Sequence, residues 1–202
     1  MRVEGEGFCI DSNGKRHSVA GIGSLPDSDS LQKLSISGAV SFDNISCDEA
    51  KIEGDGRGKS INAKNISVSG SFEVDSVKVE KKFKVSGSVQ LENLSAEEIV
   101  MESRGGSIGS VKCGKIKIYH SDGFNSEGIF SKIFGGKSSH AISSRVKIKN
   151  IDAEKVELKN CEVGEIKCKD AIIDSNCVIE KLIVTGECEI AADSKVGETV
   201  RN

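Results

Sequence analysis

The sequence predicts an all-β protein with a single-domain parallel β-helix, or β-solenoid, of about nine turns. Leu34, Ala50, Ile66, Phe83, Ile99 and Ile116 follow one another at intervals of 16 or 17 positions. Each is followed two positions later by a second small or apolar residue, which is the pattern of a short strand with one inward face. The 22 glycines and the single proline suit short strands joined by tight corners.

Such inward pairs recur three times in each period, so each turn is expected to be a triangle of three strands. The first column holds Leu34/Ile36, Ala50/Ile52, Ile66/Val68, Phe83/Val85, Ile99/Met101 and Ile116/Ile118. The second holds Val40/Phe42, Phe72/Val74 and Val89/Leu91, with Gly56/Gly58 and Gly106/Ile108 as irregular members. The third holds Ile45/Cys47, Ile61/Ala63, Val77/Val79, Leu94/Ala96 and Val111/Cys113.

After an interruption the rhythm resumes at Val146/Ile148, which we assign to the second column because GEIKC around Ile166 echoes GSVKC around Val111. This register gives the third column a uniformly small second inward position. Its members are Cys47, Ala63, Val79, Ala96, Cys113, Ala153, Cys168 and Val184. The usual crossover preference favours a right-handed coil.

The expected domain runs from 18 to 202 and carries an insertion, a loop or helix, at 119–145. Residues 1–17 are polar and glycine-rich, and we set them apart as a front end that need not be ordered. The earliest turn is expected near Val19, Ile22 and Leu25. Because we find no apolar run long enough for a signal peptide or a membrane span, a cytoplasmic protein is expected.

Six of the seven cysteines fall on inward positions, where they act as small apolar fillers: Cys47, Cys113, Cys161, Cys168, Cys177 and Cys188. Cys161 and Cys177 should stack on adjacent turns. No C-x-x-C pair is present, so neither a metal site nor a cofactor is expected.

Charge argues against nucleic acid as a partner. The 28 basic and 31 acidic residues give a net charge of −3, and they are spread along outward positions without a basic stripe. Aromatic residues make up only 4% of the chain, too few for base stacking.

Departures from the period concentrate at the corner between the first and second columns. They are GDGRGK after Ile52, ESRGG around Met101, and the stretch from Tyr119 to Arg145, and we expect all three to leave the stack there. Within this insertion the spacing of apolar residues predicts a short amphipathic helix over 126–136. Its apolar side chains either cover the flank of the solenoid or form a docking patch for a partner or a lipid surface. The residues of the docking alternative are Phe124, Ile129, Phe130, Ile133 and Phe134.

An enzymatic alternative uses His120 or His140, which flank the same insertion. Hexapeptide-repeat acyltransferases are left-handed β-solenoids with a histidine close to an extended loop. By that analogy the chain would be an acyltransferase-like or metal-dependent trimer. Those enzymes keep a stricter six-residue step than this chain, so we expect no enzyme and no catalytic residue.

The C-terminal run from Cys177 to Ile190, followed by Asp193 to Glu198, resembles the bactofilin-related polymer-forming cytoskeletal proteins of the longer Firmicutes type. This resemblance implies a non-enzymatic cytoplasmic scaffold that assembles end to end with copies of itself and recruits cell-envelope or morphogenetic proteins. The open ends of a solenoid agree with it, and the end contacts are expected at Lys195, Val196 and Glu198. Family members that bind membranes use an apolar N-terminus. Residues 1–9 carry two glutamates and an arginine, which argues against direct membrane binding.

Overall fold

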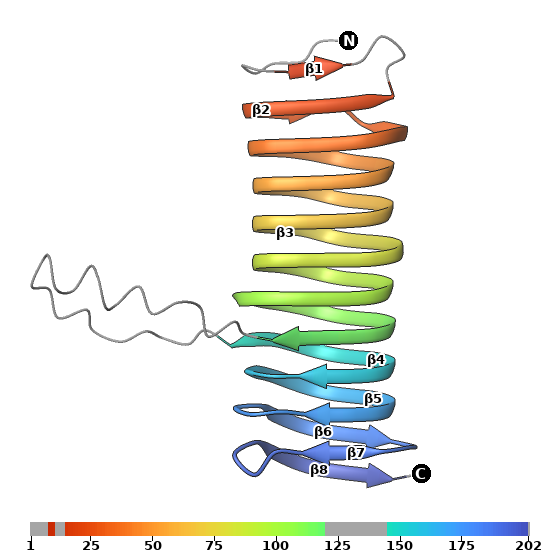
Figure 1. Cartoon of the computed structure of the whole chain (residues 1–202), viewed down its shortest axis with the longest axis vertical. Coiled ribbons are helices and arrows are strands. Elements are labelled where there is room, and N and C mark those ends of the chain that lie inside the picture. Colours follow the sequence, from red (N-terminus) through yellow and green to blue (C-terminus); the bar gives the residue numbers. More distant parts are fainter. Residues whose placement is uncertain (1–7, 11–14, 120–144, 202) are drawn as a thin grey trace, which may run out of the picture.

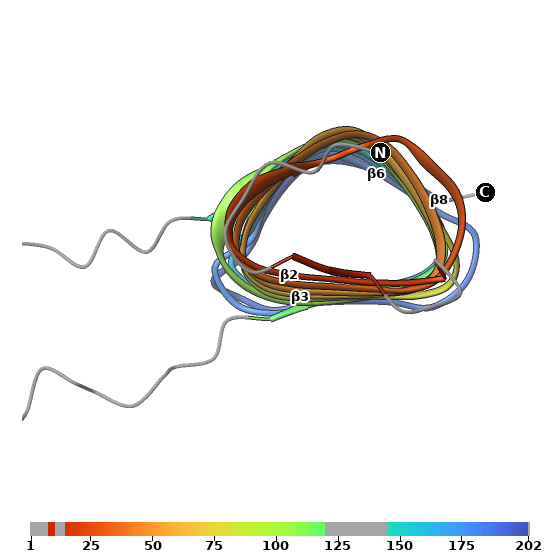
Figure 2. The ribbon, with the colours of Figure 1, turned by 90° about the horizontal axis from the view of Figure 1, so that it is seen from above.

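The computed structural model describes residues 8–10, 15–119 and 145–201, which form one coil of stacked turns (Figure 1). The strands are β1 (Phe8–Ile10), β2 (Arg16–Leu25), β3 (Ser28–Tyr119), β4 (Val146–Leu158), β5 (Cys161–Ile173), β6 (Val178–Val184), β7 (Cys188–Ile190) and β8 (Lys195–Arg201). β3 alone winds through several turns. Viewed along its axis, the coil has a rounded triangular outline (Figure 2). The predicted β-solenoid of about nine turns is therefore confirmed.

Parallel pairing holds successive turns in register from β2 to β8. Gly106 pairs with Val146, so the coil resumes after the interruption at the second column, as predicted. In the third column Cys113, Ala153, Cys168 and Val184 stack on one another, which confirms the row of small inward residues.

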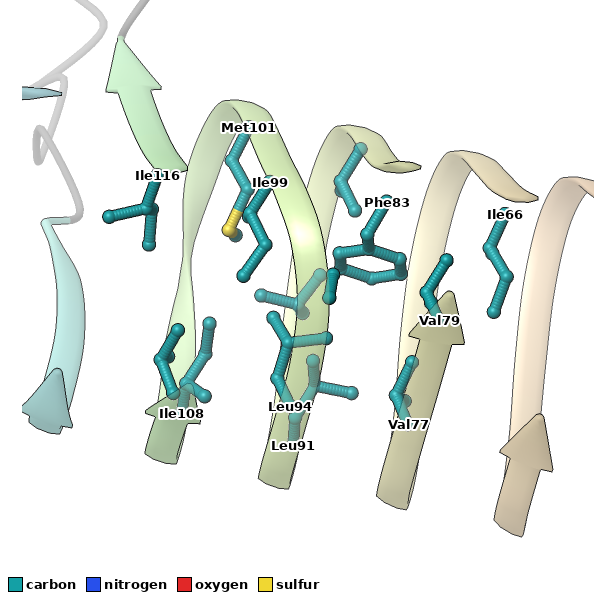
Figure 3. Packing of buried hydrophobic residues seen from close by; sticks show 14 of the residues in the cluster. Ile66, Val77, Val79, Phe83, Leu91, Leu94, Ile99, Met101, Ile108 and Ile116 are labelled. Atoms are coloured by element: carbon teal, nitrogen blue, oxygen red, sulfur yellow. The ribbon is translucent and has the colours of Figure 1, made fainter. Parts of the chain in front are cut away.

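The core is a continuous stack of the predicted inward pairs along the axis of the coil. Ile61, Val77 and Leu94, which follow one another in the third column, are each at most 2% exposed. Figure 3 shows side chains from adjacent turns pointing into the same interior space. Each turn therefore buries its apolar residues mainly against its neighbours.

Two irregular glycines of the second column are explained by aromatic rings on the adjacent turns. A Cβ on Gly58 would lie 2.2 Å from the ring of Phe42, and one on Gly56 would lie 3.0 Å from the ring of Phe72. The two rings fill the space that larger side chains would occupy at 56 and 58. The GDGRGK segment thus stays within β3, as does ESRGG, and the expectation that these two segments leave the stack is wrong.

The first turn differs from its prediction in two residues. Ile22, expected near the start of the core, is 79% exposed because the chain turns at Gly21, whose φ is 107°. His17 occupies the inward position instead, in register with Leu34, and is 4% exposed. Strand β2 therefore begins inside the 1–17 segment, and β1 pairs antiparallel with it through Phe8 and Val19.

A row of glycines forms the corner between the first and second columns in the N-terminal turns. Gly38, Gly54, Gly70 and Gly87 have φ between 123° and 149°, a region that favours glycine. A Cβ on any of them would lie between 1.9 and 2.2 Å from the carbonyl oxygen of the glycine one turn earlier. The tight corner therefore depends on the absence of a side chain.

We expect Gly70→Ala to lower the free energy of unfolding by at least about 2 kcal/mol, because alanine meets both an unfavourable φ and the carbonyl oxygen of Gly54. Urea denaturation followed by circular dichroism measures the loss. Ser71→Ala, an exposed neighbour at the same corner, is the matched control. Equal stability of the two variants would contradict this role of the glycine row.

Candidate interaction surfaces

The described coil is interrupted at the corner between the first and second columns, where β3 ends at Tyr119 and β4 begins at Val146 (Figure 1). The proposed docking residues Phe124, Ile129, Phe130, Ile133 and Phe134 lie outside the described residues, as do His120 and His140 and the helix expected over 126–136. What the structure describes are the two points where the insertion joins the rod.

At the C-terminal junction, polar side chains stack at the corner in place of the glycine row. The Arg145 guanidinium donates a hydrogen bond to the side-chain oxygen of Asn176, and the Asn176 amide donates one to the side-chain oxygen of Asn160. The backbone N–H of Asn176 also donates to Asp193, at 3.2 Å. Asn160 and Asn176 have φ of 59° and 60°, which asparagine tolerates better than most residues. This ladder fixes Arg145, the residue just before β4, to the turns that follow it.

At the N-terminal junction, three lysines surround one glutamate. Glu157 accepts contacts from Lys117 at 2.8 Å, Lys115 at 3.2 Å and Lys155 at 3.9 Å. The hydrogen bond from Lys117, followed by that from Lys115, lowers the pKa of the Glu157 carboxyl. With three cations for one anion, the surface beside Tyr119 carries a local excess of positive charge.

Strands β7 and β8 make up the last described turn of the coil. β7 pairs with β5 and β8 pairs with β6, and among the described residues no strand pairs with their other edges. Ile190 and Thr199 continue the inward rows of Ile173 and Leu182, yet both are exposed, Ile190 by 42%. The described coil therefore ends in an open cross-section, which we call the C-terminal end face: Cys188, Ile190, Val196, Thr199 and Arg201.

The three expected end-contact residues all lie on β8, but their side chains point in different directions. Val196 continues the inward row of Ile179 and is half-buried. Lys195 and Glu198 are exposed at the outer rim, and Glu198 contacts Lys181 of the turn above at 3.5 Å. Sequence reasoning did not predict Ile190 and Thr199 as end-contact residues. The signal was available, because each lies one period after a residue of an inward row, Ile173 and Leu182 respectively.

The six cysteines predicted to be inward take those positions. Burial raises the pKa of the Cys47 and Cys113 thiols to about 12 and that of Cys168 to about 11. Cys161 and Cys177 lie on adjacent turns, and the hydrogen bond between their thiols, together with burial, raises the pKa of Cys161 well above its usual value. The raised pKa values of Cys47, Cys113 and Cys168 agree with a role as core fillers. No group of three histidine, cysteine or acidic side chains in the described ranges is arranged to hold a metal ion.

Comparison with known proteins identifies no relative: no protein-family model, no curated protein and no solved structure matches this chain. In the part of the chain that the structure describes, no helix is long and apolar enough to cross a membrane. A function for this chain is therefore inferred from its fold.

Proposed function

We propose that this protein is a non-enzymatic structural scaffold, located in the cytoplasm, whose copies join end to end into filaments. The observation that carries the proposal is the C-terminal end face, where the inward rows of the rod reach the last described turn without cover. Unpaired strand edges and exposed core positions are satisfied when another solenoid continues the stack. The resemblance of residues 177–198 to bactofilin-related proteins agrees with this function.

The backbone of β8 is suited to such a contact. The N–H of Lys195 donates to the Cys177 carbonyl of the turn above at 2.8 Å. Because successive residues of a strand direct their N–H groups to opposite sides, the N–H of Val196 should face the open side. The end face thus offers both apolar side chains and free backbone donors to a second copy.

Sedimentation velocity over a range of protein concentrations tests the proposal. An end-to-end scaffold predicts a size distribution that broadens and grows without limit as concentration rises. A fixed trimer would instead support the acyltransferase-like or metal-dependent enzyme using His120 or His140. A single monomeric species would indicate a binding module whose ends are capped, a role that the polar Thr199 and Arg201 of the end face would then serve.

As a second part of the proposal, the insertion recruits cell-envelope or morphogenetic partners through its aromatic residues. We expect the double variant Phe130→Ser and Phe134→Ser to weaken partner capture from a cell extract, because it removes two large apolar side chains from the docking patch. Filaments should persist, because the C-terminal end face is unchanged. Mass spectrometry of captured proteins and sedimentation of the scaffold measure the two effects. Unfolding of the variant would show that the rings belong to the core.

A further inference from the structure

We propose that this rod also pairs side by side with a second copy of itself, in antiparallel orientation, through the outward surface of its last four first-column strands. This first-column face comprises Lys115, Lys117, Lys155, Glu157, Asp170, Ile172, Glu187 and Glu189. It lies beside the end face but does not include it. The pairing therefore goes beyond end-to-end assembly and does not depend on it.

Charges on this face are arranged in blocks along the rod. In one row Lys115 stacks on Lys155, Lys155 on Asp170, and Asp170 on Glu187, whose N–H donates to the Asp170 carboxylate at 3.0 Å. The order of charge down the row is positive, positive, negative, negative. A neighbouring row carries Lys117, Glu157, Ile172 and Glu189 in the same four turns.

At five other places on the rod, adjacent turns bring opposite charges into contact. Such contacts between turns join Asp43 to Lys59, Asp48 to Lys64, Arg57 to Glu73, Lys82 to Glu98 and Lys147 to Glu162. Like charges directly opposite on paired strands are unfavourable. The stacked lysines and the stacked carboxylates of the first-column face depart from this arrangement, and a partner of opposite charge order would neutralise both.

A second copy presents the reversed order of charges when the two rods run in opposite directions. A twofold axis along the strand direction, lying between the Lys155 and Asp170 turns, sets each row against itself in reverse. Lys115 then faces Glu187 of the other copy, and Lys155 faces its Asp170. In the neighbouring row Lys117 faces Glu189. Pairing in the same direction would instead place Lys115 against Lys117 and Glu187 against Glu189, so only the antiparallel arrangement is complementary.

Two further features of the first-column face favour a second, antiparallel copy of this chain as the partner. Within the described residues, none of the ion pairs includes Asp170, Glu187 or Glu189, whereas the three lysines share the single Glu157. Ile172 is 39% exposed and lies next to the proposed twofold axis, where it would approach Glu157 and the aliphatic stems of the lysines. The face thus has unmatched anions, excess cations and one apolar residue at its centre.

The pairing should be weak for an isolated pair of rods. Four strands about 4.8 Å apart give about 300 Å² of contact per copy, below the roughly 800 Å² of a stable interface. In a filament the same contact would repeat with every subunit, so many weak contacts would add. The role that follows is lateral bundling of filaments.

A charge-reversal pair tests the proposal in the Val196→Pro background, which is designed to block growth from the end face. One variant carries Lys115→Glu and Lys117→Glu, and the other carries Glu187→Lys and Glu189→Lys. We expect each alone to self-associate at least tenfold more weakly than the Val196→Pro parent, and an equimolar mixture to recover the parent's association. Sedimentation equilibrium measures association, and circular dichroism checks the fold of each variant.

Zero-length carbodiimide cross-linking tests the orientation. Lys115 and Glu187 of one chain lie three turns, about 14 Å, apart, so an amide between them joins two copies. A mixture of ¹⁴N- and ¹⁵N-labelled protein should give mixed-isotope Lys115–Glu187 and Lys117–Glu189 peptides. Unchanged association in both variants, failure of the mixture to recover, or cross-links confined to lysines and acids of the same or adjacent turns would overturn the proposal. Loss of end-to-end growth alone would leave these results unaffected.

Discussion

Phe83→Ala is expected to lower the free energy of unfolding by about 3–5 kcal/mol, the largest effect on stability of any single truncation that we propose. Phe83 is fully buried, and its ring lies 6.3 Å from that of Phe72, centroid to centroid. Figure 3 shows it between Ile66 and Ile99, the first-column residues of the adjacent turns. Truncation would therefore leave a cavity shared by three turns.

Urea denaturation of purified protein measures this loss, with Lys84→Ala as the matched control. Lys84 is the next residue of the same strand and faces solvent, so its truncation should change stability by less than about 0.5 kcal/mol. Because the turns depend on their neighbours, the whole transition should move to lower urea rather than split. A loss no larger than that of Lys84→Ala would contradict the stacked core.

Val196→Pro is expected to abolish end-to-end assembly while leaving the rod folded. Proline removes the N–H that we place on the open side of β8, and it keeps the bond from Lys195 to Cys177. Proline is tolerated at the edge of a sheet, where no neighbouring strand needs the donor. The variant should sediment as a species of fixed small size at concentrations where the parent forms polymers.

Val196→Thr is the control for this prediction, because threonine keeps the N–H group and the branched shape of valine. It should retain assembly, with at most a modest increase in the concentration required. Circular dichroism should show the same strand content in both variants. Polymers of undiminished length in Val196→Pro would remove β8 from the assembly contact.

The stacking of the inward pairs could be predicted from the sequence because two periods coincide there. A spacing of two marks the inward side of each strand. A spacing of 16 or 17 stacks Leu34 between His17 of the preceding turn and Ala50 of the following turn. The same reasoning failed at His17 itself because it counted only apolar side chains. It also placed Ile22 with the core, since the corner at Gly21 depends on a backbone angle that no side chain reveals.

Contacts between turns account for the remaining differences. Gly56 and Gly58 look like gaps along the chain, but the rings that fill them come from turns above and below. The blocks of like charge on the first-column face follow from the predicted register, which the pairing of Lys155 with Asp170 confirms, but inward positions alone do not reveal them. The expected end contacts Lys195 and Glu198 lie on the correct strand, yet the exposed core positions beside them, Ile190 and Thr199, emerge from the pairing of the last turn.

Negative-stain electron microscopy of the purified protein tests the central claim most directly. End-to-end stacking through the C-terminal end face predicts unbranched filaments of variable length, one rod wide or bundled, whose number falls on dilution. Val196→Pro should give isolated short rods under the same conditions. Uniform single particles of the parent protein at every concentration, whether monomers or closed trimers, would contradict the proposed scaffold.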